Sequence, residues 1–129
     1  MIYFISGHLS LTQGEFDAYY KPLIDEALSY GHSFVVGDAK GADTMAQDYL
    51  DGKTDKVTVY HMFESPRYNA GFPTVGGFLA DGERDSCMTD NSDGDIAWVK
   101  KGRERSGTQK NLDRRSKLRF RLLYLGGDR

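Results

Sequence analysis

Three short glycine-containing turns in this chain combine residue types that can hold an anion. They are Ser6-Gly7-His8, the stretch Gly37-Asp38-Ala39-Lys40-Gly41-Ala42-Asp43, and Ser106-Gly107-Thr108. Glycine lets the backbone approach a ligand closely, and free N–H groups at the start of a helix, together with the helix dipole, favour a phosphate. Every strand-to-helix turn needs small residues, so one such turn would indicate little. Three of them favour an anionic, nucleotide-like ligand.

The pair Arg84-Asp85 is a second candidate for ligand chemistry. An arginine can grip a phosphate with two parallel hydrogen bonds, and a neighbouring carboxylate can orient it or bind a ribose hydroxyl. The more common alternative is a surface arginine with a local aspartate partner. For catalysis, the candidate carboxylates are Asp38, Asp43 and Asp85, and nothing in the sequence singles out one of them.

Several classes of site find no support in the sequence. The chain has no GxxxxGK[ST] motif and no GxGxxG after its first apolar run, which argues against a P-loop NTPase and against nicotinamide-dependent hydride transfer. His8, His32 and His61 show no metal-ligand spacing, and the one cysteine, Cys87, excludes a cysteine-rich zinc site. We therefore expect neither a metal nor a cofactor.

The apolar pattern indicates which elements position these residues. Runs rich in β-branched and aromatic residues predict strands at 2–5, 33–36, 56–60, 95–99 and 120–125. Helical spacing predicts a helix from the Thr12 capping box to near Gly31, interrupted at Pro22, and helices ending at 51–52, over 79–91 and over 106–117. Residues 62–78, with two prolines and three glycines, are predicted to form a long loop.

Strands that alternate with helices predict a parallel sheet with helices on both faces. We expect residues 1–129 to form one doubly wound, Rossmann-like α/β domain with a sheet of about five strands. In such a sheet the ligand crevice lies at the carboxyl ends of the strands, near the point where the strand order reverses. The three turns and Arg84 are therefore expected to meet at one edge.

Charge is distributed unevenly along the chain, although the net charge is only -2. Residues 100–121 contain ten Lys or Arg against two acidic residues, and the rest of the chain is strongly acidic. This asymmetry indicates either an anionic partner such as single-stranded nucleic acid, or a solvated helix face with a basic edge strand. No apolar run reaches the ~20 residues of a membrane helix, and the first residues lack a secretory signal. We expect no membrane partner and a cytoplasmic location.

Three blocks of the sequence resemble motifs of one superfamily. Residues 34–43, followed by Met45-Ala46, resemble the pattern GG-x-x-GAD-x-x-A. Arg84 to Met88, with Ser92-Asp93 and residues 95–99, resembles R-x-x-x-M … AD-x-x-IA, and residues 106–111 resemble the phosphate turn GGxGTxxE. The chain is thereby similar to small proteins of the SLOG superfamily, which groups the DNA-processing protein A (Smf) and LOG-type Rossmann-like domains.

The resemblance implies a nucleotide pocket in which residues 41–43 touch the ribose or phosphate, Arg84 reaches the ligand and Gly107-Thr108 cradles the phosphate. LOG-type enzymes cleave the N-glycosidic bond of a cytokinin nucleotide and carry a catalytic glutamate three residues after the Gly-Thr pair. This chain has Asn111 there, which cannot act as a carboxylate base. Homo-oligomers are common in the superfamily.

Four functions remain open from the sequence. The leading one is a sensor or sequestering protein that binds a nucleotide or nucleotide-sugar. The alternatives are a hydrolase or transferase that acts at a nucleotide N-glycosidic bond through one of the aspartates, a single-stranded nucleic-acid binder that uses segment 100–121, and an interaction module with a vestigial pocket.

Overall fold

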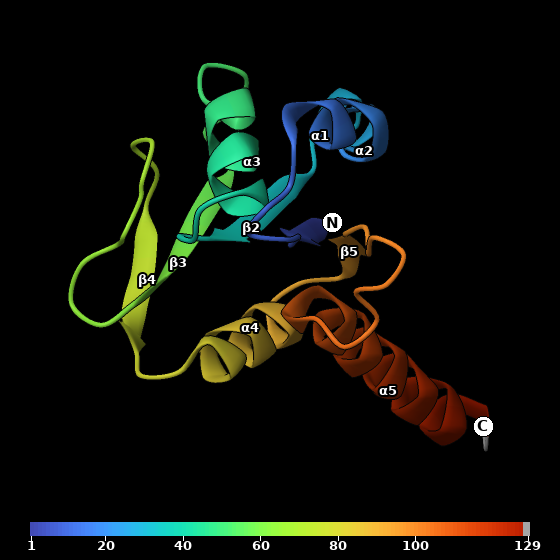
Figure 1. The fold of residues 1–129 in the computed structure, drawn as a ribbon. Helices are drawn as coiled ribbons and strands as arrows, with labels where there is room; N and C mark the ends of the chain where they lie inside the picture. Colours follow the sequence, from blue (N-terminus) through green and yellow to red (C-terminus); the bar gives the residue numbers. More distant parts are fainter. Residues whose placement is uncertain (128–129) are drawn as a thin grey trace.

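Five short strands form an all-parallel sheet in the computed structural model, which describes residues 1–127 (Figure 1). In chain order the strands are β1 (Ile2–Ile5), β2 (Ser33–Gly37), β3 (Val57–Met62), β4 (Thr74–Phe78) and β5 (Gly94–Ile96). They are arranged β4-β3-β2-β1-β5. The predicted fold class is therefore confirmed: this is an α/β domain built on a parallel sheet.

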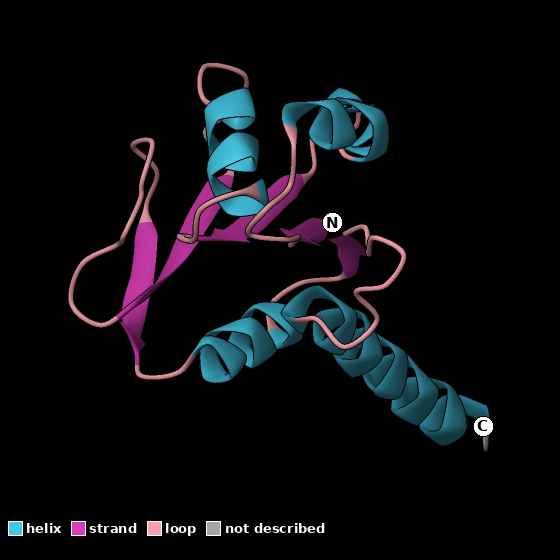
Figure 2. Ribbon diagram, viewed as in Figure 1, coloured by secondary structure: helices cyan, strands magenta, loops and turns pink. Residues whose placement is uncertain are grey.

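Helices cover both faces of the sheet (Figure 2). On one face lie α1 (Gln13–Tyr19), α2 (Lys21–Ser29) and α3 (Ala42–Leu50), and on the other lie α4 (Asp81–Asp90) and α5 (Gly107–Gly127). Within these described residues, no helix has the length and apolar character needed to cross a bilayer.

The start of the first helical segment follows the prediction closely. The Glu15 backbone N–H donates to Thr12 Oγ1 at 3.1 Å, and the Thr12 N–H donates to Glu15 Oε1 at 3.0 Å, which completes the capping box. Pro22 divides the helical pattern, because α1 ends at Tyr19 and α2 begins at Lys21 with the proline in its first turn.

Two of the predicted elements are wrong. Residues 74–78, expected within the loop 62–78, form the edge strand β4, in which two glycines conceal the strand pattern. Residues 120–125, expected as a strand, belong to α5. The largely apolar run there is also typical of a buried strand, but no glycine or proline interrupts residues 108–125, and leucine, lysine and arginine favour helix extension. The strand predicted at 95–99 is shorter and ends at Ile96.

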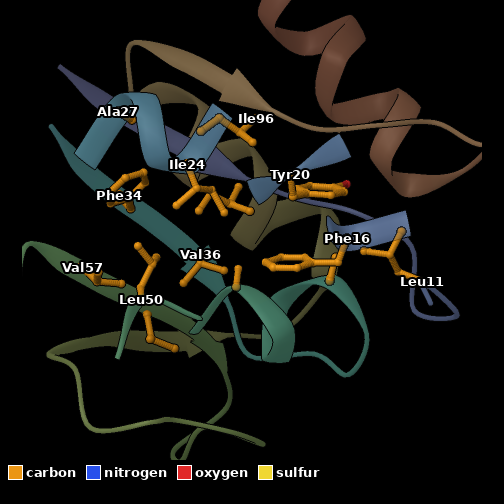
Figure 3. Close-up of a cluster of buried hydrophobic side chains, with 14 residues drawn as sticks. Leu11, Phe16, Tyr20, Ile24, Ala27, Phe34, Val36, Leu50, Val57 and Ile96 are labelled. Carbon is orange, nitrogen blue, oxygen red and sulfur yellow. The ribbon is translucent and has the colours of Figure 1, made fainter. Parts of the chain in front are cut away.

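The main hydrophobic core lies between the sheet and α1–α3, where Phe16, Ile24 and Leu50 are completely or almost completely buried (Figure 3). Tyr20 belongs to this core and ties two turns together. Its hydroxyl donates to the Ser6 carbonyl at 2.7 Å and accepts from the Trp98 N–H at 3.1 Å. The segment that follows β1 is thereby held against the segment that follows β5.

Candidate ligand-binding site

A cavity of about 270 Å³ lies at the carboxyl edge of the sheet. The strand order reverses here, because β1 pairs with β2 on one side and with β5 on the other. The turn after β1, the turn after β2, helix α4 and the start of α5 all contribute to its wall. The residues predicted from the sequence that line it are Ser6, Gly7, His8, Asp43, Arg84, Asp85, Ser106, Gly107, Thr108 and Asn111.

Four residues predicted to bind ligand instead shape the turn after β2 and do not line the cavity: Gly37, Asp38, Gly41 and Ala42. A Cβ atom at Gly37 would lie 2.4 Å from Asp43 Oδ2, so the glycine makes room for that carboxyl group. Gly41 has a φ of +77° and packs directly on the backbone carbonyls of His8 and Leu9, which requires glycine on both counts.

Arg84 is buried and organises the carboxylates of the site. Its Nη1 donates to Asp38 Oδ1 at 2.8 Å, and its Nε and Nη2 donate to Asp85 Oδ1 at 3.1 and 3.0 Å. Asp81 Oδ1 lies 3.4 Å from Nη1. Most of the guanidinium N–H groups of Arg84 therefore already donate to protein carboxylates. Arg84 holds these carboxylates in place and leaves few donors for a bound phosphate.

Asp38 is held in its ionised form by Arg67 and Arg84. Its side chain is fully buried, and Arg67 binds it through the backbone N–H at 2.9 Å, Nε at 3.2 Å and Nη2 at 2.8 Å. Burial acts to raise the pKa of Asp38, but the hydrogen bonds from Arg67 and the charges of Arg67 and Arg84 lower it overall. Asp38 is therefore a structural anion and the least accessible of the three candidate catalytic carboxylates.

Asp43 has the opposite electrostatic character. It is 7% exposed, and its Oδ2 accepts a hydrogen bond from the Ala39 N–H at 3.1 Å. Burial raises the pKa of Asp43 to about 7, with the charges of Asp85 and Asp38 adding to the effect and Arg84 and the Ala39 N–H opposing it. Near neutral pH this group can hold or release a proton inside the cavity.

The start of α5 forms an electropositive part of the wall. Ser106 caps the helix, because its Oγ accepts from the Gln109 N–H at 3.2 Å and its carbonyl accepts from the Lys110 N–H at 3.1 Å. The N–H groups of Gly107 and Thr108 belong to the first turn, where a helix provides no backbone acceptor. The exposed Arg103 lies next to them on the cavity wall.

Asn111, one turn into α5, connects this helix to Asp85 of α4. Its Nδ2 donates to Asp85 Oδ2 at 3.1 Å, and its Oδ1 accepts from Arg114 Nη1 at 2.5 Å. The amide group is buried and fixed between a carboxylate and an arginine. The carboxylate next to position 111 is therefore supplied by Asp85 of α4.

Two polar side chains after β1 complete the cavity. His8 Nε2 accepts from the Lys100 N–H at 2.9 Å, so the neutral ring carries its proton on Nδ1. Burial, followed by the charge of Arg103, lowers the pKa of His8. The buried Ser6 hydroxyl has no hydrogen-bond partner among residues 1–127. A buried hydroxyl in a cavity wall without a partner is a free contact for a ligand.

Arg67 and Asp81 also line this wall. Arg67 lies in the segment 63–73, which is fastened to α3 by Gln47: its Nε2 donates to the Tyr68 carbonyl at 3.3 Å and its Oε1 accepts from the Ala70 N–H at 2.9 Å. The Tyr68 hydroxyl also bonds to Asp48. No local motif marks Arg67, since its partner Asp38 lies 29 residues earlier in the chain.

Part of the basic segment 100–121 is used within the domain. Arg115 binds the Ser92 carbonyl at 2.9 Å and Asp95 Oδ1 at 3.3 Å, and Lys100 pairs with Glu15 at 3.4 Å. The side chains from residue 119 onward lie outside the described ones.

Neither a metal-ligand cluster among the described residues nor a similar known protein assigns a function to this site. Among residues 1–127, no three His, Cys, Asp or Glu side chains are grouped so that they could hold a metal ion. No family model matches the chain, and neither a curated protein nor a solved structure matches it.

Proposed function

We propose that this chain binds a nucleotide or nucleotide-sugar ligand in the cavity at the carboxyl edge of the sheet, as a sensor or sequestering protein. The proposal rests on one observation: the cavity wall has an electropositive part and an acidic part. The start of α5 and Arg103 suit a phosphate, whereas Asp43 and Asp85 suit groups that donate hydrogen bonds, such as sugar hydroxyls.

The size of the cavity narrows the ligand class. Its volume of about 270 Å³ falls near the lower end of small-molecule sites, which span roughly 300–1,000 Å³. A mononucleotide or sugar phosphate suits this space better than a dinucleotide. We also propose that the chain is a small single-domain member of the SLOG superfamily. The parallel sheet supports this, as does the gathering of residues from all three resembling blocks around one cavity.

Arg103→Ala is expected to weaken binding of the phosphorylated ligand about tenfold or more, because a hydrogen bond to a charged group contributes roughly 1.5–3 kcal/mol. The measurement is a thermal-shift panel followed by calorimetry, with nucleoside mono-, di- and triphosphates, NAD, ADP-ribose, cyclic nucleotides and a short single-stranded DNA. A ligand at a hundred times its Kd stabilises the folded state by about 2.7 kcal/mol.

Arg105→Ala is the matched control, since Arg105 is an exposed arginine two residues away that does not line the cavity. It should leave the affinity unchanged. No thermal shift with any small nucleotide would refute the proposed function. A shift with DNA alone, reduced equally by both substitutions and steeply weakened by salt, would favour the nucleic-acid alternative.

A second candidate function is hydrolysis or group transfer at a nucleotide N-glycosidic bond. The buried Asp43, with its pKa near 7, favours it, because a departing base needs a proton donor that is still protonated at neutral pH. Asp85, held by Arg84 and Asn111, would be the carboxylate that stabilises positive charge developing on the sugar.

If this second candidate is right, incubation with the nucleotide that binds should release free base, detectable by chromatography. Asp43→Asn and Asp85→Asn should each lower the rate at least about a hundredfold, in the range usual for loss of an acid–base group. Calorimetry should still detect nucleotide binding by both variants. The wild-type rate should fall as pH rises through 7, where Asp43 loses its proton. Nucleotide binding without base release at any pH would leave the binding protein as the function.

A further inference from the structure

A second cavity lies between the end of β3 and the end of β4. It is an open groove of about 920 Å³, and we call it the β4 groove. The residues that line it are His61, residues 63–65, Gly76, Gly77 and Leu79. None of these residues lines the ligand cavity. The β4 groove is therefore a separate place on the molecule.

His61 places a hydrogen-bond acceptor in the wall of this groove. The residue is 5% exposed, and its Nδ1 lies 3.0 Å from the Met62 carbonyl oxygen. A carbonyl oxygen can only accept, so Nδ1 carries the proton and Nε2 of the neutral ring has a lone pair. No group among the described residues donates to Nε2. A buried acceptor without a partner in a cavity wall indicates a ligand that donates a hydrogen bond.

Gly76 makes room for this part of the ring. A Cβ atom at Gly76 would lie 2.0 Å from His61 Cε1 and 2.2 Å from His61 Nε2. Any other residue at position 76 would therefore occupy the space beside the free nitrogen. The glycine that interrupts the apolar pattern of β4 is thus required by the imidazole ring next to it.

Backbone hydrogen bonds hold the two walls of the groove together. The Phe63 N–H donates to the Phe78 carbonyl at 2.9 Å, and the Gly77 N–H donates to the Phe63 carbonyl at 2.8 Å. Gly77 has a φ of +90°, which favours glycine, and the register between β3 and β4 shifts here. The irregular end of β4 is therefore fixed by its contacts with Phe63, so the groove is a preformed site.

The remaining side chains of the groove are apolar or acidic. Phe63 and Leu79 are 58% and 75% exposed, high values for residues of these types. Among the described residues that line the groove, Glu64 alone carries a charge, and it is exposed. A ligand that fits these groups has an apolar body, a positive charge and a hydrogen-bond donor.

We propose that the β4 groove binds a small organic amine with an aromatic body, an arylalkylamine. Its ammonium group, which has donors only, would donate to His61 Nε2 and lie near the Glu64 carboxylate. Its ring would contact Phe63 and Leu79. A phosphate or a carboxylate does not fit, because it would face the His61 lone pair and the Glu64 charge. The proposal does not depend on the proposed function.

NMR of the His61 ring nitrogens in the full chain tests the proposal, with phenethylamine as the probe. At about pH 8 an ordinary histidine is uncharged and the amine is still protonated. The Nε2 signal should be that of an unprotonated nitrogen and should move as amine is added. The expected Kd is roughly millimolar, because an open groove encloses only part of the ligand. Phenethyl alcohol has the same ring without the charge and should bind at least about threefold more weakly.

Three substitutions in the groove locate the bound amine. Glu64→Gln and Leu79→Ala should each weaken binding about threefold, and both positions are exposed, so the fold should be retained. His61→Phe keeps a flat ring but removes the acceptor, and it should weaken binding about tenfold. Circular dichroism verifies that each variant is folded.

Glu83→Gln is the matched control, because Glu83 is an exposed glutamate of α4 that does not line the groove. It should leave the affinity for phenethylamine unchanged. A wild-type chain that does not bind millimolar amine would overturn the proposal. Binding that leaves the His61 Nε2 signal in place, or that is equally strong in Glu64→Gln and Leu79→Ala, would also overturn it, because the amine would then lie elsewhere.

Discussion

Arg84→Met should lower the free energy of unfolding by about 3–5 kcal/mol, the usual cost of removing one partner from a buried ion pair. Arg84 is 6% exposed and binds both Asp38 and Asp85. Methionine keeps much of the side-chain volume but leaves Asp38 with Arg67 alone and removes both arginine hydrogen bonds from Asp85. Urea denaturation at neutral pH measures the difference.

Arg105→Met is the matched control, because the same replacement at an exposed position should change stability by no more than about 0.5 kcal/mol. A loss below about 1 kcal/mol for Arg84→Met, in the range of an exposed pair, would contradict the structural role assigned to Arg84. Arg84 is therefore a poor position at which to test ligand binding. A ligand effect lost in an Arg84 variant would not separate binding from folding, whereas Arg103 lines the cavity from an exposed loop.

Asp43→Asn should become more stable than the wild type as pH rises from about 4 to about 8. The pKa of Asp43 is raised from an ordinary value of 3.8 to about 7, so the folded protein binds this proton more tightly than the unfolded chain. The wild type therefore loses unfolding free energy between these two values. Each pKa unit corresponds to about 1.4 kcal/mol, which sets an upper limit of roughly 4 kcal/mol at pH 8.

Urea denaturation of both proteins at pH 5, 6, 7 and 8 gives the difference directly, because contributions common to the two proteins cancel. Infrared spectroscopy supplies an independent readout: the wild type should show a protonated carboxylic acid band that titrates near pH 7 and is missing in Asp43→Asn. Parallel stability curves for the two proteins across this range would show that Asp43 titrates like an exposed carboxyl group.

Much of the lining of the cavity was predictable from sequence, because parallel strands bring their carboxyl ends to one edge of the sheet. Ser6 follows β1, and Thr108 lies at the start of α5, the helix that comes after β5. The two residues are far apart in the chain, yet both line the cavity. The pattern of apolar residues thus predicted which turns would meet. The position of Arg67 depends instead on a tertiary contact, because Asp38, 29 residues earlier in the chain, accepts its hydrogen bonds.

For two segments, the local sequence pattern predicts the wrong secondary structure. Residues 120–125 form a largely apolar run that is typical of a buried strand, but they continue a helix that has already begun at Gly107. Extension of an existing helix adds one hydrogen bond per ordered residue, whereas a new strand needs a neighbour to pair with. In β4, two glycines mask the strand, which forms because β3 offers a free edge.

By itself, the sequence determined the class of fold and the turns that meet at its edge, because hydrophobic periodicity and glycine placement are local properties. Only the tertiary structure decided the chemistry of the carboxylates. Asp38, Asp43 and Asp85 are one residue type with the same intrinsic acidity. Two arginines hold Asp38 ionised, and burial keeps a proton on Asp43 to about pH 7. Acidity depends on solvent exposure and on charges brought from distant parts of the chain, and neither exists until the chain is folded.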